Sequence, residues 1–375
     1  MQKTVYIHIG APKTGTTAIE SFFALNRNSL RKNGYLYPGY GLDHHEIANE
    51  INDTKKNKGD LLHRNSNTLR VLREIQNTEC HSIIISSDWF YSMGGAIKLK
   101  QTMEQMLGKL FIVKIIFYGR RQDHAFQSAY QQMVKPCSRK PLTIPISEFL
   151  LDKNRLRQWD YYHKLQEWEE AFGKDAIIVR VYEKKQFYKD DLIRDFLHII
   201  GLELTEKFQL PTEKQSNISL GPDAIEFMRL VNLEIENREV KTFLLKSLES
   251  IDKKQVWVPF SLVSPHERLD IITFFSESNQ NVARKYLDRN DGKLFYEPLP
   301  DPDEPWVQYE GLTIEKIVPI FSLMLFNLDK KYQNQMREKR GVNLKGKVKH
   351  QIKKFGARIG LLPTMQYWYN RFYRS

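Results

Sequence analysis

Residues 5–17 read VYIHIGAPKTGTT, which is a short run rich in Ile and Val, a turn with two glycines and a proline, and the start of a helix. The helix continues with Ile19, Phe22 and Phe23 at helical spacing. Glycines at positions 10 and 15 allow a tight turn in which several backbone N–H groups point inward, and the helix N-terminus adds the positive end of its dipole. The segment therefore predicts a strand, an anion-binding loop and a helix.

Three further runs rich in apolar residues predict buried strands at residues 83–86, 111–118 and 177–181. Segments with helical periodicity separate the predicted strands, at residues 17–30, 69–75, 125–134 and 161–172. Strands and helices that alternate in this way predict an α/β fold, with a parallel sheet covered on both faces. Ligands of such sheets bind beyond the carboxyl ends of the strands, so the turns after residues 9, 86 and 118 are the places to search for a site.

The composition is that of a globular protein, with 375 residues, 41% hydrophobic and 27% charged. The longest apolar stretch, residues 317–328, is shorter than the roughly 20 residues of a membrane-spanning helix. Two cysteines, Cys80 and Cys137, predict neither a disulfide framework nor a cysteine zinc site. The first residues lack the pattern of an export signal, so we expect a cytoplasmic protein.

The net charge of +12 is concentrated at the C-terminal end. Residues 330–375 hold thirteen Lys and Arg against one acid, so residues 1–329 are neutral overall and no nucleic-acid partner is expected for them. Residues 297–310 contain four prolines and five acids, a composition typical of a linker. We therefore predict a domain at 1–296, with a helical subregion at about 190–293, a linker at 297–312 and a basic helical extension at 313–375.

The predicted loop differs from that of nucleoside triphosphatases. Their loop places a lysine directly after the second glycine and a metal-binding hydroxyl after the lysine. Here Thr16 follows Gly15, and Lys13 lies two residues before it. The loop therefore lacks the cation on which an ATPase depends. A turn with Thr16 capping the helix is the structural alternative.

A second predicted anion site follows residues 111–118, where Arg120 and Arg121 precede a predicted helix that contains Ser128. Arg120 at the approach to the helix N-terminus and Ser128 within its first turns could reach one anion. The arginine fork can bond two oxygens of a terminal phosphate at once. Alternatively, the arginine pair bonds Asp123 or another nearby acid.

The two motifs together resemble those of the sulfotransferases that use 3′-phosphoadenosine 5′-phosphosulfate (PAPS). These enzymes have a P-K-[ST]-G-[TS]-[TS] loop after the first strand, matched by residues 12–17, and an arginine and a serine eight residues apart, matched by Arg120 and Ser128. The form of residues 120–130, together with residues 168–183 and 191–202, is similar to the bacterial carbohydrate sulfotransferases. The resemblance covers residues 1 to about 295.

The resemblance implies a P-loop-like three-layer α/β/α fold and transfer of a sulfuryl group from PAPS without a metal. Lys13 would bond the oxygen between sulfuryl and phosphate, and the loop would hold the 5′-phosphosulfate. Arg120 and Ser128 would hold the 3′-phosphate. The residues so assigned to the donor are Pro12, Lys13, Thr14, Gly15, Thr16, Thr17, Arg120, Ser128 and, for adenine, Tyr182.

Two positions depart from the family pattern. Many cytosolic members carry a tryptophan after the loop threonines, where it stacks on adenine, but this chain has Ala18. Adenine is then expected near Tyr182 or residues 217–219. Golgi-type members follow the arginine with Asp-Pro or Asn-Pro, whereas this chain has Arg121 and Gln122, which leaves the side-chain directions at this turn open.

A hydroxyl acceptor must lose a proton, so a His, Glu or Asp is expected within hydrogen-bond reach of it. Asp88 follows the strand at 83–86, with a helix N-cap as its alternative role. His44 and His45 lie in a segment that resembles a histidine-containing segment of bacterial members. Adjacent histidines point in different directions, so we expect only one to be catalytic and choose His45.

The acceptor expected from the resemblance is a glycan hydroxyl, as in a bacterial surface or capsular polysaccharide. Residues 344–375 form a basic, aromatic and amphipathic pattern, typical of a helix on an anionic membrane such as the inner face of the plasma membrane or, equally, of a helix packed on the domain. Two other functions stay open: a P-loop kinase of a small molecule, and a non-enzymatic protein that binds membranes or nucleic acid. The oligomeric state is not predicted.

Overall fold

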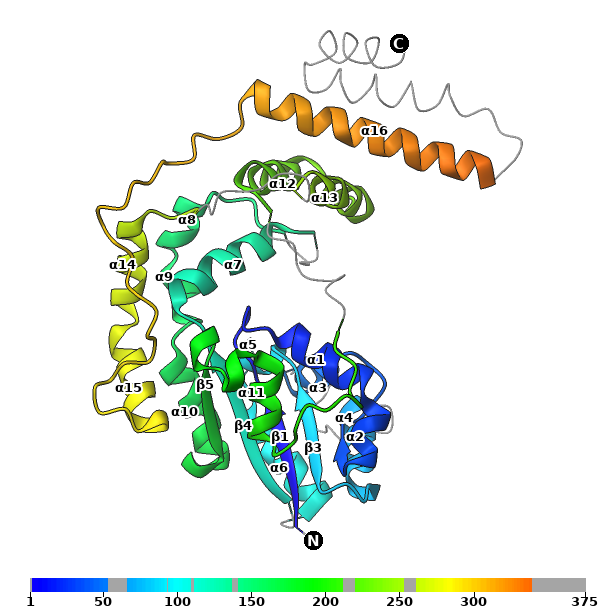
Figure 1. Cartoon of the computed structure of the whole chain (residues 1–375), viewed down its shortest axis with the longest axis vertical. Coiled ribbons are helices and arrows are strands. Elements are labelled where there is room, and N and C mark those ends of the chain that lie inside the picture. The colour runs from blue at the N-terminus through cyan, green and yellow to red at the C-terminus, as the bar shows by residue number, and fades with distance from the viewer. Residues whose placement is uncertain are drawn as a thin grey trace. The chain divides into compact units, whose positions relative to one another are not determined.

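Five short, largely apolar strands form one parallel sheet in the order β2-β3-β1-β4-β5. The strands are β1 (Lys3–His8), β2 (Tyr35–Leu36), β3 (Ser82–Ser86), β4 (Phe111–Gly119) and β5 (Ile177–Val181). The structure is a computed structural model, which describes residues 2–52, 66–92, 94–108, 111–136, 141–211, 220–252 and 261–338. The predicted α/β fold with a parallel sheet is confirmed (Figure 1).

The four strands predicted from the sequence are present, with ends that differ by one or two residues. The fifth strand, β2, was not predicted, because two residues are too few to show a periodic pattern. The helix expected over residues 17–30 is broken at Asn26 into α1 (Thr16–Leu25) and α2 (Arg27–Lys32). The Asn26 amide donates to the backbone oxygens of Phe22 and Gln209, both at 2.8 Å, which fixes the break.

The strand β1 lies at the centre of the sheet, between β3 and β4, with Ile7 paired to Ile85 on one side and Ile115 on the other. The chain extends the sheet on the β3 side first and then returns to the β4 side. Strand order reverses at this point, and the turns after β1 and β4 flank the crevice where ligands of open α/β sheets bind.

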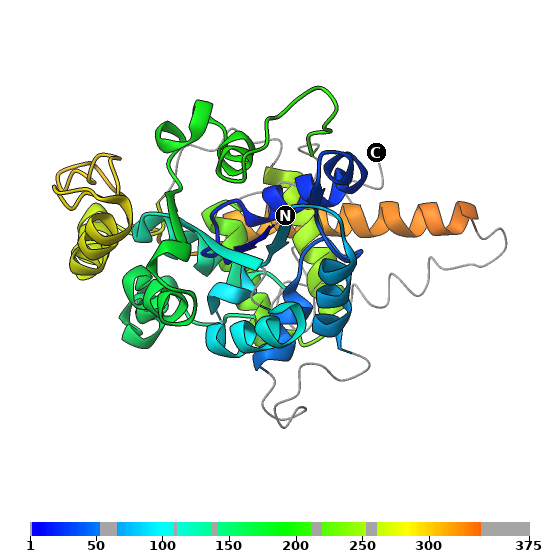
Figure 2. The ribbon, with the colours of Figure 1, turned by 90° about the horizontal axis from the view of Figure 1, so that it is seen from below.

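One face of the sheet is covered by α1 and by α11 (Leu192–Ile199). Ile19, Phe22 and Phe23 of α1 are buried because they recur at three- and four-residue steps on one side of the helix. They pack with Phe196 of α11 against sheet residues that include Tyr118. Figure 2 shows helices on both sides of the strands, as a three-layer arrangement requires.

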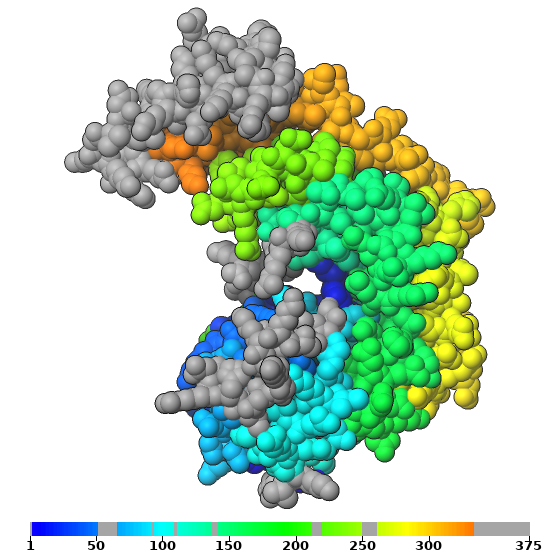
Figure 3. Space-filling view, turned by 180° about the vertical axis from the view of Figure 1, so that it is seen from behind, coloured from blue at the N-terminus to red at the C-terminus, as the bar shows by residue number. Residues whose placement is uncertain are grey.

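The other face is covered by α6 (Ala96–Leu107) and α10 (Tyr161–Phe172). The Tyr161 ring packs edge-on against Phe117 of β4, with centroids 5.2 Å apart. Helix α15 (Ser276–Leu287) packs in turn on α10, and both are visible from behind in Figure 3. The sheet unit also contains most of α7 (Gln122–Val134), whose last two residues belong to the second unit. Its remaining helices are α3 (His45–Asn52), α4 (Asn67–Asn77), α5 (Trp89–Ser92), α8 (Ile146–Leu151), α9 (Lys153–Arg157) and α14 (Pro265–Phe274), with the 3-10 turns η2 (Lys174–Ala176), η3 (Lys184–Gln186) and η4 (Tyr188–Asp190).

A second unit contains α12 (Pro222–Glu234), α13 (Arg238–Asp252) and α16 (Ile314–Glu338). Helices α12 and α13 belong to the same compact unit as α16, while α14 and α15 belong with the sheet. The sheet unit ends at Gln308, within the predicted linker. None of the described helices combines the length and apolar character that crossing a bilayer requires.

Candidate active site

The loop between β1 and α1 adopts the tight turn that its sequence predicts. Gly10 and Gly15 have φ angles of 30° and 78°, and Lys13 has a φ of 69°, in the left-handed region that favours glycine. A side chain at Gly15 would lie 2.3 Å from the end of the Leu192 side chain, which would have to shift to accommodate it. Gly15 is the N-cap residue of α1 and cannot cap it with a side chain, which leaves backbone N–H groups available to an anion.

The three loop threonines have different environments. The Thr14 hydroxyl donates to the backbone oxygen of Ala11 at 2.6 Å, and this hydrogen bond stabilises the turn. The Thr16 side chain is 5% exposed, and its hydroxyl has no hydrogen-bond partner within the described part of the chain. Thr17 is exposed, and Pro12 is half-buried. The capping role considered for Thr16 is not observed, since the helix begins with this residue.

Arg120 brings the two predicted anion motifs together. Its Nη1 donates to the backbone oxygen of Lys13 at 3.2 Å and to the hydroxyl of Ser128 at 3.3 Å. The same guanidinium lies over the ring of Tyr182, 5.7 Å from its centroid. Tyr182 directly follows β5, and its ring also borders Gly15. These residues of three separate turns therefore converge on one point at the carboxyl edge of the sheet.

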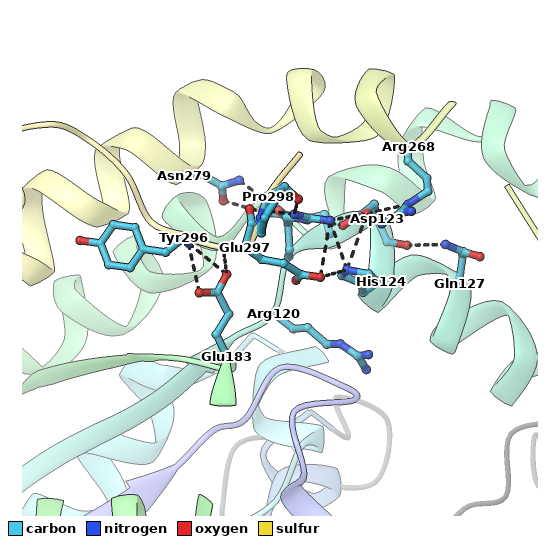
Figure 4. A network of polar contacts seen from close by, with 12 residues as sticks. Arg120, Asp123, His124, Gln127, Glu183, Arg268, Asn279, Tyr296, Glu297 and Pro298 are labelled. Carbon is cyan, nitrogen blue, oxygen red and sulfur yellow. Dashed lines mark hydrogen bonds and ion pairs between the residues drawn. The ribbon is translucent and has the colours of Figure 1, made fainter. Parts of the chain in front are cut away.

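Arg120 and Arg121 point in opposite directions. The Tyr161 hydroxyl accepts from the backbone N–H of Arg120 at 3.3 Å and donates to its backbone oxygen at 2.5 Å, which holds the turn between them. Arg121 is 2% exposed and bonds both carboxylate oxygens of Asp123. In Figure 4, Arg120 points away from the cluster around Asp123. The alternative of an arginine bonding Asp123 therefore holds for Arg121 alone.

The Arg121 cluster ties distant parts of the sheet unit to the turn. Arg121 also donates to the backbone oxygens of Glu297 and Pro298, at 3.1 and 2.7 Å, and Arg268 of α14 bonds Asp123 at 2.8 Å (Figure 4). Burial alone would raise the pKa of Asp123, but hydrogen bonds from Arg121 and the neighbouring cations hold that pKa below its ordinary value. The first residues of the predicted linker are thus part of the packed structure.

Lys13 lies between the donor motifs and a group of acids. Its Nζ donates to Oε1 of Gln132 on α7 at 2.5 Å. The Lys13 charge also acts on Asp88 after β3. Burial and the Asp43 carboxylate raise the pKa of Asp88, whereas Lys13 and His45 lower it. The backbone N–H of Trp89 donates to the Ser87 hydroxyl at 3.2 Å. The N-cap role considered for Asp88 is therefore filled by its neighbour Ser87.

His45, the first residue of α3, forms a dyad with Asp43. The His45 Nδ1 lies 2.6 Å from Oδ1 of Asp43, and its ring is 5.8 Å from that of Trp89. A carboxylate at Nδ1 stabilises the tautomer with a proton on this nitrogen, which leaves a lone pair on Nε2. The His45 side chain is 46% exposed, so it can meet a large acceptor from solvent.

His44 has a structural environment. Its ring is buried, and its two nitrogens lie 3.2 Å from the backbone oxygen of Ser86 and 3.1 Å from that of Pro38. Burial lowers the pKa of His44 to about 4, against the opposing effect of these hydrogen bonds. The two histidines therefore face different surroundings, as expected for adjacent residues, and only His45 has the exposure that a base needs.

Several polar groups packed against the loop were not predicted from the sequence. Glu20 of α1 is 5% exposed, His8 ends β1 with a fully buried ring, and Ser86 ends β3 between them. The available signal was an acid on the buried side of α1, four residues after Thr16, and a histidine inside an apolar strand. The predicted adenine segment 217–219 and the tail 344–375 lie outside the described residues. No cluster of His, Cys, Asp and Glu suited to a metal occurs among the described residues.

Comparison with known proteins gives limited likeness. No family model matches the chain. A protein of Archaeoglobus fulgidus, described only as an uncharacterized protein, is 30% identical over 178 residues, which are 47% of this chain and 46% of the relative. The chain thus spans just under half of that relative's length. A crystal structure of a sulfotransferase from Alicyclobacillus acidocaldarius superposes over 63% of this chain and 98% of its own, with a TM-score of 0.37 and 15% identity.

Proposed function

We propose that the protein is a sulfotransferase that moves a sulfuryl group from PAPS to a hydroxyl of a glycan. The observation that supports this most directly is the bonding of Arg120 to both Ser128 and the Lys13 backbone. The proposal assigns the 3′-phosphate to Arg120 and Ser128, and the 5′-phosphosulfate to the loop and the helix N-terminus, which no side chain caps. One adenosine carrying both anions would then span the two motifs, with Tyr182 beside the nucleotide.

In the proposed reaction an acceptor oxygen attacks sulfur, and the bond between sulfur and the bridging oxygen breaks. Lys13 bonds that oxygen and stabilises the negative charge that develops on the leaving phosphate. The acceptor proton passes to Nε2 of His45, while Asp43 holds the ring and stabilises the resulting imidazolium. The products are a sulfate ester and adenosine 3′,5′-bisphosphate. Asp88 is the alternative base, because the charges of both Lys13 and His45 act on its carboxylate.

The proposal of a glycan acceptor is supported by the solvent exposure of His45 in the dyad with Asp43. Trp89 is 41% exposed beside His45, and an exposed aromatic face is a platform on which a sugar ring stacks. A bacterial surface or capsular polysaccharide is the acceptor that the sequence resemblance favours.

Binding of adenosine 3′,5′-bisphosphate tests the proposal. We expect the nucleotide to raise the melting temperature of the protein in the presence of EDTA, and Mg²⁺-ATP to have a smaller effect. Transfer of radioactive sulfate from PAPS to a panel of bacterial polysaccharides then identifies the acceptor. A protein stabilised by Mg²⁺-ATP alone, with ATP turnover that depends on Lys13, would instead be a kinase.

A further inference from the structure

Three buried side chains next to the proposed donor loop are linked by hydrogen bonds. The Ser86 hydroxyl lies 3.2 Å from Oε1 of Glu20 and 2.8 Å from Nδ1 of His8. The three residues come from α1, β3 and β1, and each is at most 5% exposed. Buried polar groups are costly unless they bond one another, so these three side chains are a defined part of the fold.

These three residues link the two ends of the donor loop. At one end, Glu20 belongs to the helix into which the loop leads. At the other end, a Cβ atom on Gly10 would lie 3.0 Å from Nε2 of His8 and 2.7 Å from the Thr16 hydroxyl, so the imidazole packs directly on the first turn of the loop. Glu20, Ser86 and His8 therefore connect the helical end of the loop to its beginning.

Ser86 also connects Glu20 and His8 to the segment that carries the proposed base. Its backbone N–H donates to Nδ1 of His44 at 3.1 Å, and its backbone oxygen accepts from the N–H of His44 at 2.9 Å. His44 lies between the two members of the Asp43 and His45 dyad in the sequence. One residue at the tip of β3 thus contacts both the donor side and the acceptor side of the site.

We infer that Glu20, Ser86 and His8 form a positioning relay that holds the donor loop in its binding conformation. This inference rests on the proposed function for its ligand, a nucleotide with phosphate or phosphosulfate groups. The relay touches neither substrate; it acts through Gly10 and the first turn of α1.

The charges around Glu20 agree with a neutral acid. Burial, followed by the charges of Asp43 and Asp88, raises the pKa of Glu20 to about 9, and the Ser86 hydrogen bond opposes this rise only in part. Tyr37 faces Glu20 as well and contributes no positive charge. An ionised Glu20 would place a third carboxylate beside an anionic donor.

The test compares Glu20→Ala, Glu20→Gln and Ser86→Ala with Ser82→Ala, using calorimetric titration with adenosine 3′,5′-bisphosphate. Ser82 is the matched control because it is a buried serine at the opposite end of the same strand. We expect Glu20→Ala and Ser86→Ala to weaken binding about tenfold or more, the size of one lost buried hydrogen bond, and Ser82→Ala to leave it unchanged. Glu20→Gln should restore binding, because the amide is neutral at every pH.

The pH dependence separates positioning from packing. Wild-type affinity should fall as the pH rises through about 9, and this fall should be smaller in Glu20→Gln. The relay is refuted if Glu20→Gln binds as poorly as Glu20→Ala, or if Ser86→Ala and Ser82→Ala behave alike. If the wild-type protein does not bind the nucleotide at all, the proposed function fails. Amide hydrogen exchange of residues 10–16 then tests the relay alone: faster exchange in Ser86→Ala than in Ser82→Ala supports it, and equal exchange overturns it.

Discussion

Arg120 donates from Nη1 to the backbone oxygen of Lys13 at 3.2 Å, so the turn after β4 is bonded to the turn after β1. The contact joins residues that lie 107 positions apart in the sequence. A neutral backbone oxygen is a weaker partner for a guanidinium than an anionic phosphate. The bond therefore holds the guanidinium at the sheet edge without preventing its use by a ligand.

Replacing Arg120 by alanine should weaken binding of adenosine 3′,5′-bisphosphate by about 10- to 100-fold, since hydrogen bonds to charged groups contribute about 1.5 to 3 kcal/mol. The loss should be smaller for adenosine 5′-monophosphate, which lacks the 3′-phosphate. Titration calorimetry measures both. Arg31→Ala, on the exposed surface of α2, is the control. An equal loss for both nucleotides would contradict the assignment of Arg120 to the 3′-phosphate.

Replacing Lys13 by methionine should reduce the rate of transfer far more than it weakens donor binding, because the lysine stabilises charge that develops only as the bridging bond breaks. We expect a loss of about 100-fold or more in single-turnover rate, comparable to the loss of one oxyanion donor. Rapid-quench measurement with saturating PAPS separates the two effects. A variant with normal turnover but poor binding would show that Lys13 holds the ground state only.

Replacing His45 by alanine should lower transfer by about 100- to 10,000-fold, the usual contribution of a general base. Asp43→Asn should have an intermediate effect, because an asparagine amide can donate to Nδ1 and favour the wrong tautomer. Added imidazole should partly rescue His45→Ala. If Asp88→Asn abolishes transfer while His45→Ala retains it, Asp88 is the base.

Replacing Asp123 by asparagine should destabilise the protein by about 3 to 5 kcal/mol, because the buried Arg121 would lose its nearest carboxylate and the half-buried Arg268 its ion pair with Asp123. Urea unfolding followed by tryptophan fluorescence gives the change in unfolding free energy. Asp152→Asn is a suitable comparison, since its ion pair with Arg155 is on the surface and should contribute far less to stability. Similar losses for the two variants would show that the Arg121 cluster is not a stabilising unit.

Buried neutral histidines should make the protein less stable in acid. The pKa of His44 is about 4 in the folded chain and 6.5 ordinarily, so between these values only the unfolded chain takes up the proton. Unfolding free energy is then lost as the pH falls, by up to about 1.4 kcal/mol per pH unit and histidine. His8, with a pKa lowered by burial to about 3, acts in the same sense.

Glu20 changes the unfolding free energy with pH in the opposite direction, because its raised pKa makes the folded chain hold a proton that the unfolded chain releases. The net slope is therefore measured best as a difference between variants. His44→Gln should lose less unfolding free energy than the wild type between pH 6.5 and 4.5. Parallel curves for the two proteins would mean that His44 is charged in the folded state.

Local patterns in the sequence were sufficient for four of the five strands, since Ile and Val runs of strand length are recognisable one by one. They also predicted the tight turn after the first strand, because glycines at this spacing favour a turn whatever packs around it. Which helices pack with which unit was not predictable, because the packing partners of α12 to α15 come from segments remote in the sequence.

The chain's own order of residues thus determined a parallel α/β protein with a lysine-bearing loop and an arginine after a later strand. Only the tertiary structure decided that Arg120 faces the loop while Arg121 is buried, and that His45 is open while His44 is enclosed. It also decided that Glu20 and His8 meet at Ser86, across 66 and 78 positions of sequence. The reason is physical: burial and hydrogen-bond partners set the charge and direction of a polar side chain, and both come from segments that are remote along the chain.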